Sequence, residues 1–440
     1  MPWGSAVALL RALRAGEVSC VEATAESLDL IAAADGGLRA FEHVAAEAAL
    51  ERARALDERV EAGSPAHPLR GVPVAIKDVF DTADMPTRYG SPQYRDHRPA
   101  ADAVAVALLR AAGAVLVGKT QTAEFACMHP CETRNPIDPR RTPGGSSSGS
   151  AAAVAAGMVP LATGTQTAAS TIRPASYCGV LGYTPTSGAI STAGVLSTSH
   201  TLDTVGLFAT CVADLALFAR VLTTPLAGEP TRRSGRPLSL AGAEEELEAP
   251  PRVAWARYPW TPLDDEARAA IEALVDRVER WGARVEEIEP PGFDALSQAQ
   301  QHVQRRETAA ALRADVRRDP DSVSEELRAY IEVAGEVTDG EYEAALRRAD
   351  EWRWRWADLL RDHDALLVPS TIGVPDPGLD FTGDPLPCRP WTLLGFPSLA
   401  LPLAWTAEGL PIGVQLVGPL DSDARVLRAG AWLLARSANV

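Results

Sequence analysis

The chain has 440 residues, of which 46% are hydrophobic and 23% are charged, and its net charge is −16. This composition is that of a globular protein that can bury a large core. An acidic chain lacks the basic face that nucleic-acid binding needs, so we expect no nucleic-acid partner.

The sequence predicts neither a secretory signal nor a membrane span. Its N-terminal stretch has no basic region followed by a long apolar run, and no window approaches 18 uninterrupted apolar residues. The six cysteines are sparse. We therefore expect a cytoplasmic protein with reduced thiols and no membrane partner.

The N-terminal region has the pattern of a helical flank. Amphipathic patterns predict helices over 5–14 and 19–34, and Ser19 with Glu22 has the spacing of a capping box. A third helix is predicted over 41–62, a segment rich in Ala, Glu and Arg. We expect its charged face to be solvated.

Helical patterns then alternate with short apolar runs. The run 69–80 is bounded by Gly and Pro and predicts a buried strand. A helix near 101–112 precedes a strand at 114–120, and a helix near 151–156 precedes a strand near 158–162. This alternation predicts an α/β sheet covered by helices.

The C-terminal half continues this pattern. A helix is predicted over 264–282, and residues 295–363 are almost wholly helical and strongly charged. Trp352 and Trp356 lie on one face of their helix, and we expect them to pack against the body of the protein. Further strands are expected at 251–258, 284–288 and 364–370, and two more within 395–417.

The stretch from Pro143 to Ser176 carries the strongest chemical signal. It is rich in Gly, Ser and Ala, has almost no charge, and contains the serine run 146–148 and a separate serine at 170. Small residues let the backbone approach another group closely, and hydroxyls supply nucleophiles and proton carriers. This stretch is the candidate site of a nucleophilic reaction.

A serine nucleophile needs a base, and Lys77 is the candidate. None of the seven histidines lies in a G-x-S-x-G or an H-E-x-x-H context, so a Ser-His-Asp site is not favoured. Lys77 follows three apolar residues in the predicted buried strand, and burial lowers the pKa of a lysine. A neutral amine can accept a proton at neutral pH.

These features resemble the amidase signature family of serine hydrolases. The resemblance covers most of the chain in the family's order. It includes the segments 71–78, 118–126, 135–150, 143–176, 199–206 and 395–418. It implies one α/β/α layered domain around a large mixed β-sheet.

The resemblance implies a role for individual residues. Lys77 matches the family's catalytic lysine, and Ser146 matches the bridging serine, which follows a glycine through a cis peptide bond. Ser170 matches the serine that is acylated. The backbone N–H groups of the turn before it would hold the oxyanion, and they belong to Thr167, Ala168, Ala169 and Ser170 itself.

Two positions depart from the usual family pattern. Ala168 and Ala169 stand where the family usually has two glycines, which adds two methyl groups to the oxyanion turn. Gln166 stands where many members have Asp. The resulting Gly-Thr-Gln-Thr motif resembles the malonamidase-like subgroup of small-amide hydrolases, so Gln166 is a candidate substrate-binding residue.

Arg173 is the other mark of that subgroup. In malonamidase-like members the matching arginine binds a substrate carboxylate, a task that suits a guanidinium group. The alternative is a structural arginine that ties its loop to backbone carbonyl groups. The sequence leaves both interpretations open.

The resemblance implies one domain, within which four parts of the chain can be distinguished. We expect a single amidase domain over 1–440. Its parts are a helical flank at 1–62, a signature core with the catalytic triad at 63–223, a surface loop at 224–250, and the remaining sheet and helices at 251–440.

The expected activity is hydrolysis of a small carboxylic amide, or of a urea- or carbamate-like C–N bond, through an acyl-enzyme on Ser170. We expect a small-molecule amide as substrate and no cofactor. Cys127, His129 and Cys131 have no second pair at zinc-finger spacing, so we expect no metal either. Asp203 is expected to make structural hydrogen bonds. A homodimer is left open.

Three alternatives to hydrolysis remain. The same triad could pass the acyl group to an amine, as in an acyltransferase or an amide-forming biosynthetic enzyme. The chain could be an amidotransferase subunit that releases ammonia from glutamine for a partner. It could also be a degenerate, non-catalytic member, an alternative that only the two alanines support.

Overall fold

The computed structural model describes residues 3–61, 67–224, 238–245, 247–256 and 262–438. The strands in these ranges are short and mostly buried. They are β1 (Phe41–Val44), β2 (Pro73–Lys77), β3 (Val115–Thr120), β4 (Leu161–Gln166), β5 (Leu181–Thr184), β6 (Thr204–Ala209), β7 (Arg252–Ala256), β8 (Arg284–Ile288), β9 (Ala365–Pro369), β10 (Ser398–Trp405) and β11 (Pro411–Val417).

The α-helices of the same ranges vary widely in length. They are α1 (Ala6–Ala15), α2 (Cys20–Leu38), α3 (Ala46–Glu61), α4 (Val104–Ala111), α5 (Ser148–Ala155), α6 (Ile172–Cys178), α7 (Val212–Leu222), α8 (Asp265–Arg280), α9 (Phe293–Arg318), α10 (Glu325–Ala334), α11 (Asp339–Leu359), α12 (Arg389–Leu394) and α13 (Asp423–Ser437).

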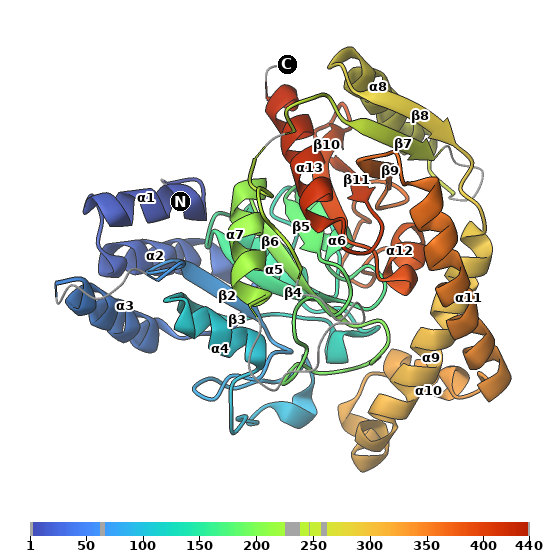
Figure 1. Cartoon of the computed structure of the whole chain (residues 1–440). Helices are drawn as coiled ribbons and strands as arrows, with labels where there is room; N and C mark the ends of the chain where they lie inside the picture. The colour runs from blue at the N-terminus through green and yellow to red at the C-terminus, as the bar shows by residue number, and fades with distance from the viewer. Residues whose placement is uncertain (1–2, 62–66, 225–237, 246, 257–261, 439–440) are drawn as a thin grey trace.

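The eleven strands in the described part of the chain form one mixed sheet, in the order β1-β3-β2-β4-β6-β5-β10-β11-β9-β7-β8. In Figure 1 helices α7 and α13 lie in front of this sheet, and α5 and α6 lie behind it. The α/β fold with a large mixed sheet is therefore confirmed.

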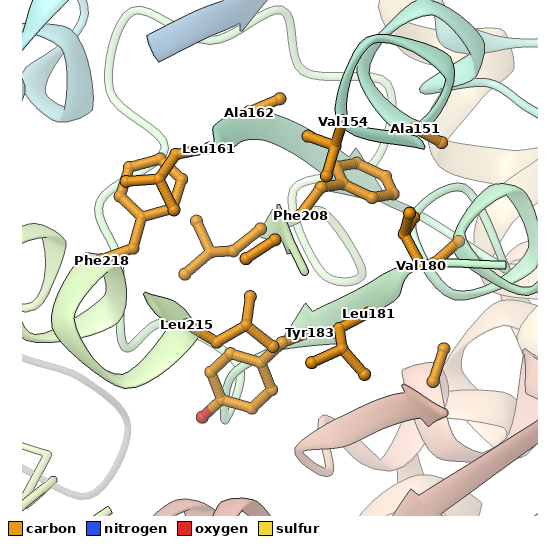
Figure 2. Packing of buried hydrophobic residues seen from close by; sticks show 14 of the residues in the cluster. Ala151, Val154, Leu161, Ala162, Val180, Leu181, Tyr183, Phe208, Leu215 and Phe218 are labelled. Atoms are coloured by element: carbon orange, nitrogen blue, oxygen red, sulfur yellow. The ribbon is translucent and has the colours of Figure 1, made fainter. Parts of the chain in front are cut away.

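The alternation of side chains along β4 and β6 builds the core on both faces of the sheet (Figure 2). Ala162 of β4 lies opposite Phe208 of β6, and both face α5. Leu161, one residue earlier in β4, points to the other face, toward Phe218 of α7. A strand buried on both faces needs this nearly continuous apolar sequence.

The pairing of β2 and β4 brings distant parts of the sequence to one edge. The two strands are parallel, with Val74 opposite Leu161 and Ala75 opposite Ala162. Their carboxyl ends therefore lie together, so Lys77 at the end of β2 lies beside the last residues of β4. The turn that follows β4 begins at the same place.

Two sequence predictions were wrong in the first half of the chain. Residues 41–44 form β1 instead of the start of a helix, because they pair antiparallel with β3 at the edge of the sheet. The strand predicted near 158–162 is β4, which begins only at Leu161 and extends to Gln166. Pro160 just before it has no N–H group to donate to a ladder.

The charged face of α3 is solvated, as expected, since Glu51, Arg54 and Glu58 are exposed, while the helical flank packs its apolar side chains against the body. Helix α1 buries Leu9, Leu10 and Leu13, and the predicted capping box of Ser19 and Glu22 at the start of α2 is confirmed. The flank therefore contributes to the main core.

The predicted packing of Trp352 and Trp356 against the body of the protein is confirmed. Trp356 of α11 is fully buried, and its ring meets that of Trp391 in α12 edge to face, with centroids 5.0 Å apart. Trp352 packs at the margin of the same cluster. Trp354, on the opposite face of the helix, is 81% exposed.

Most of the loop predicted at 224–250 lies outside the described residues. In its described part, the side chains of Leu240 and Ala243 are buried in the main core, so this part is not wholly a surface loop. All six cysteines are free thiols. None of the helices in the described ranges has the length and apolar character that crossing a membrane requires.

Candidate active site

Lys77 is fully buried at the end of β2, and its surroundings favour the neutral amine. Its Nζ lies 2.8 Å from Ser146 Oγ and 2.7 Å from Thr165 Oγ1. Burial away from water penalises the charged form and lowers the pKa of the lysine to about 7. A substantial fraction of Lys77 can therefore accept a proton at neutral pH.

Ser146 links the lysine to the start of α5. The Gly145–Ser146 peptide bond is cis, as the family resemblance predicted. Ser147 exchanges hydrogen bonds of 3.3 Å with the backbone of Thr165, and Ser148 Oγ donates to Gly144 O at 2.7 Å. The two following serines thus fix the backbone on either side of Ser146.

Ser170 lies in the turn between β4 and α6, close to the serine run. Its carbonyl oxygen accepts a hydrogen bond from Ser147 N at 3.2 Å. Its side chain is partly exposed. The structure thus brings Lys77, Ser146 and Ser170 into one site from three separate parts of the sequence.

The carbonyl groups of the turn 167–170 are all occupied. Each accepts one hydrogen bond, and the donors come from α9, α12, α6 and the residue just before α5. Thr167 O accepts from Gln300 Nε2 at 2.9 Å, Ala168 O from Thr392 Oγ1 at 2.7 Å, Ala169 O from Arg173 N at 2.9 Å, and Ser170 O from Ser147 N at 3.2 Å.

The N–H groups of the same turn are free to bind a ligand. Within the described residues none of the four donates a hydrogen bond to a protein group. Backbone donors held in this way, beside a nucleophile, are what an oxyanion hole requires.

The two alanines fit the turn without backbone strain. Neither Ala168 nor Ala169 has a positive φ, so the conformation does not require glycine. Their methyl groups are buried, and both residues line the cavity next to Ser170. The departure from the family's glycines is therefore compatible with the geometry of the turn.

Ser170 opens onto a cavity of about 360 Å³. Helix α9 contributes Gln301, Gln304 and Arg305 to its wall, and α10 contributes Tyr330. Two helices of the charged segment 295–363, α9 and α10, therefore line the pocket. Lys77 and Ser146 are buried and are not among the residues that line the cavity.

Arg173 lines the cavity but is engaged within the protein. Its two terminal nitrogens donate to Gly383 O at 2.6 Å, to Gly145 O at 2.7 Å and to Thr382 Oγ1 at 3.0 Å. These contacts match the structural alternative, in which the arginine ties its loop to backbone carbonyls. They leave only Nε of the buried guanidinium without a partner among the described residues.

Gln166 holds the turn and does not reach the cavity. Its Oε1 accepts from the backbone N–H of Thr171 at 3.0 Å and of Ile172 at 3.1 Å, and its Nε2 donates to Thr392 Oγ1 at 3.1 Å. The side-chain amide thus satisfies the first N–H groups of α6. None of these contacts supports the prediction that Gln166 binds substrate.

The surroundings of Asp203 and Cys127 can be compared with the roles expected for them. Asp203 accepts hydrogen bonds from Thr167 Oγ1 at 2.6 Å and from the backbone of Thr198 and Ser199, as expected for a structural role. Cys127 lines the cavity, and burial raises the pKa of its thiol to about 12. No group of three metal-ligating side chains occurs among the described residues.

Sequence reasoning missed the residues that support the turn from a distance. Gln300 and Thr392 hold two of its carbonyl groups, yet they lie 133 and 224 residues from their partners. No local pattern marks them. Thr165 lies in the Gly-Thr-Gln-Thr motif, and the alternation of β4 could have placed its hydroxyl near Lys77.

The fold and the site together define an enzyme that acts on carbon–nitrogen bonds. The family model described as Amidase matches residues 22–427. The chain therefore belongs to the Amidase family, the amidase signature enzymes that the sequence motifs predicted.

Curated relatives match along almost the whole chain. The A subunit of the Glutamyl-tRNA(Gln) amidotransferase of Symbiobacterium thermophilum is 34% identical, and the match covers 97% of this chain and 95% of the relative. The protein with the same description from Mycobacteroides abscessus is 35% identical, with coverage of 97% and 96%. These relatives show the family and do not place the chain in the malonamidase-like subgroup.

Solved structures share the fold over the same length. A chain described in connection with a vestigial protein complex and the origins of an s-triazine catabolic enzyme has a TM-score of 0.90 and 30% identity, covering 98% of both chains. The native peptide amidase from Stenotrophomonas maltophilia has a TM-score of 0.83 and 28% identity, covering 99% of this chain and 97% of its own.

Proposed function

We propose that the protein hydrolyses a small carboxylic amide, or a urea- or carbamate-like C–N bond, through an acyl-enzyme on Ser170. One observation carries the proposal. A buried lysine with a pKa of about 7 contacts Ser146, next to a turn whose N–H groups are unoccupied within the described part of the chain. Base, relay and oxyanion donors meet at Ser170.

The proposed first half-reaction forms a bond from Ser170 to the carbonyl carbon, breaks the C–N bond, and carries the proton of Ser170 to the leaving nitrogen. The Ser170 hydroxyl turns toward Ser146 and gives up its proton, while Ser146 passes its own proton to neutral Lys77. Ser170 Oγ attacks the carbonyl carbon, and the free N–H groups of residues 167–170 hold the oxyanion. The C–N bond breaks as Ser146 gives a proton to the leaving nitrogen and takes one back from Lys77, which leaves Lys77 neutral again.

Water completes the cycle by the same relay. It attacks the acyl carbon and loses a proton through Ser146 to Lys77. The bond between the acyl carbon and Ser170 Oγ then breaks, the proton returns from Lys77 through Ser146 to Ser170 Oγ, and the carboxylic acid is released. The cavity of about 360 Å³ is near the small end of ligand sites, which supports a small substrate. The Gly-Thr-Gln-Thr motif supports placing the chain with the malonamidase-like small-amide hydrolases.

Covalent labelling with a fluorophosphonate probe tests the proposal. We expect the intact mass of the protein to show one adduct, mapped to Ser170 and absent in Ser170→Ala. Ser437→Ala is the matched control, because that hydroxyl bonds Leu434 O at the end of α13, outside the site. A cooperatively folded protein that takes up no probe, or takes it up at another serine, would contradict the proposal.

A second candidate function rests on the curated relatives. Their description as the A subunit of an amidotransferase, with coverage above 90% of both chains, supports a subunit that releases ammonia from glutamine for a partner. Purification from the native organism separates the two functions. Hydrolysis by the chain alone supports the stand-alone amidase, and glutaminase activity that needs co-purifying proteins supports the second candidate. The homodimer stays a prediction.

A further inference from the structure

Two arginines on the cavity wall have no partner in the described chain. Arg305 of α9 and Arg389 at the start of α12 both line the cavity that Ser170 opens onto. Neither makes a hydrogen bond or an ion pair with any described residue. By contrast Arg306, the next residue along α9, pairs with Asp339 at 2.5 Å.

The lack of a partner is costly at Arg389. Its side chain is only partly exposed, and its Nε is buried with no acceptor among the described residues. Burial lowers the pKa of the Arg389 guanidinium, and the charge of Asp384 opposes this effect without cancelling it. Buried polar groups in native proteins nearly always have a partner. We therefore expect a bound ligand to supply a hydrogen-bond acceptor for Arg389.

The nearby carboxylate does not fill this gap. Asp384 also lines the cavity, but its Oδ1 accepts from Leu386 N at 2.8 Å, and no ion pair joins it to Arg389 within the described residues. Arg173, Arg305 and Arg389 outnumber Asp384 among the charged residues that line the cavity, which leaves a net positive charge there. A negatively charged group on a ligand would reduce this excess.

We propose that the cavity takes amides whose non-reacting end carries a carboxylate, and that Arg305 and Arg389 hold this carboxylate. The inference rests on the proposed function, because it identifies the substrate class of the same site. A carboxylate offers two oxygens to guanidinium donors. Arg173, the arginine that the sequence suggested for this task, is occupied by carbonyl and hydroxyl oxygens.

The test measures binding without turnover. Ser170→Ala protein is titrated in a calorimeter with malonamate, succinamate, glutaramate and adipamate, and with the neutral amides that carry a methyl group in place of each carboxylate. We expect at least one acid to bind tenfold or more tightly than its neutral partner. A phosphonate analogue, 3-phosphonopropanamide, tests whether the site prefers a dianion.

Variants then assign the preference to residues. Arg305→Gln and Arg389→Gln are each expected to reduce it at least tenfold, and the double variant to abolish it. Arg389→Lys keeps the charge without the planar fork, so we expect an intermediate loss. Arg306→Gln is the matched control and is expected to bind like the parent, since Arg306 pairs with Asp339 away from this cavity.

The outcomes separate this inference from the proposed function. Equal binding of acids and neutral amides across the series, a preference that survives in the double variant, or stronger binding of the phosphonate would each overturn the carboxylate assignment. Labelling of Ser170 by the fluorophosphonate does not depend on these arginines. Labelling without carboxylate preference therefore rejects the inference alone, and preference without labelling rejects hydrolysis alone.

Discussion

Two buried lysines at neighbouring strand ends show how partners decide the role of an amine. Lys119 of β3 has a carboxylate partner, Asp78, at 3.0 Å, which opposes the effect of burial on its pKa. Lys77 of β2 contacts only the hydroxyls of Ser146 and Thr165 among the described side chains. Desolvation lowers the pKa of both lysines, and the charge of Asp203 opposes it only weakly at Lys77. Lys77, which has no carboxylate in contact, can serve as a base, while Lys119 is paired with Asp78.

The hydroxyl of Thr165 is expected to tune this base. Thr165→Val removes an acceptor 2.7 Å from Nζ, and losing an acceptor disfavours the protonated amine, so the pKa of Lys77 should fall below its present value of about 7. The midpoint of the pH–rate profile for Ser170 labelling should move to lower pH. An unchanged or raised midpoint in a folded variant would show that Thr165 does not act on the lysine.

At the scale of elements, the link between β4 and α6 is held from both ends. Gln166 satisfies the first N–H groups of α6, and Gln300 and Thr392 hold the carbonyls of Thr167 and Ala168. Side chains from α9 and α12 thus orient the backbone so that its N–H groups face the site. The position of the oxyanion donors depends on the packing of these helices.

Gln166→Ala is expected to lower the free energy of unfolding. It leaves the buried N–H groups of Thr171 and Ile172 without an acceptor, at a cost of about 1–3 kcal/mol each. Gln166→Glu keeps an acceptor oxygen for both N–H groups and loses only the donor to Thr392, so its loss should be smaller. Urea denaturation of both variants measures the difference. Equal stability of Gln166→Ala and the parent would refute the capping role.

The sequence predicted the parts of the site that lie in compact motifs. Lys77, Ser146 and Ser170 stand in segments whose composition already indicates a buried strand and close backbone turns, and the structure brings them together. The residues Gln300, Thr392, Arg305 and Arg389 come from helices far along the chain. Their approach to the site depends on tertiary packing, which no local pattern encodes.

The fold, too, was predicted where a local pattern marks an element and missed where only tertiary pairing does. Apolar runs such as 69–80 predicted buried strands, because burial on both faces demands continuous apolar sequence. β1 was missed, because four residues beside an Ala- and Glu-rich helix carry too little pattern to indicate a strand. Only their antiparallel pairing with β3 fixes them as one.

At the scale of the molecule, one sheet and one main core join both ends of the chain. The main core contains Leu9 of α1 and Leu433 of α13, and we propose that residues 1–440 form a single domain. Asp214 of α7 anchors the flank, since its carboxylate accepts from Ala6 N at 2.7 Å and from Val7 N at 2.8 Å. This side chain joins α1 to the body of the protein.

Asp214→Ala should weaken that anchor without changing the chemistry. It leaves two helix-start N–H groups without an acceptor, and we expect about 1–3 kcal/mol of lost stability in urea denaturation, with Asp214→Asn intermediate because one oxygen remains. The rate of Ser170 labelling should stay the same, because Asp214 lies beyond the C-terminal end of β6 and the site lies at the opposite end of that strand. A slower rate in the folded variant would contradict a purely structural role.

The pH dependence of Ser170 labelling by a fluorophosphonate is the most direct test of the central claim, that a neutral Lys77 activates the nucleophile. Only the unprotonated lysine can take the proton, so the labelling rate should rise about tenfold per pH unit below about 7 and level off above it. In Lys77→Ala the rate should fall by about 10²–10⁴-fold and lose this step. A flat profile in the parent protein, or a midpoint near the ordinary lysine pKa of about 10.4, would contradict the account.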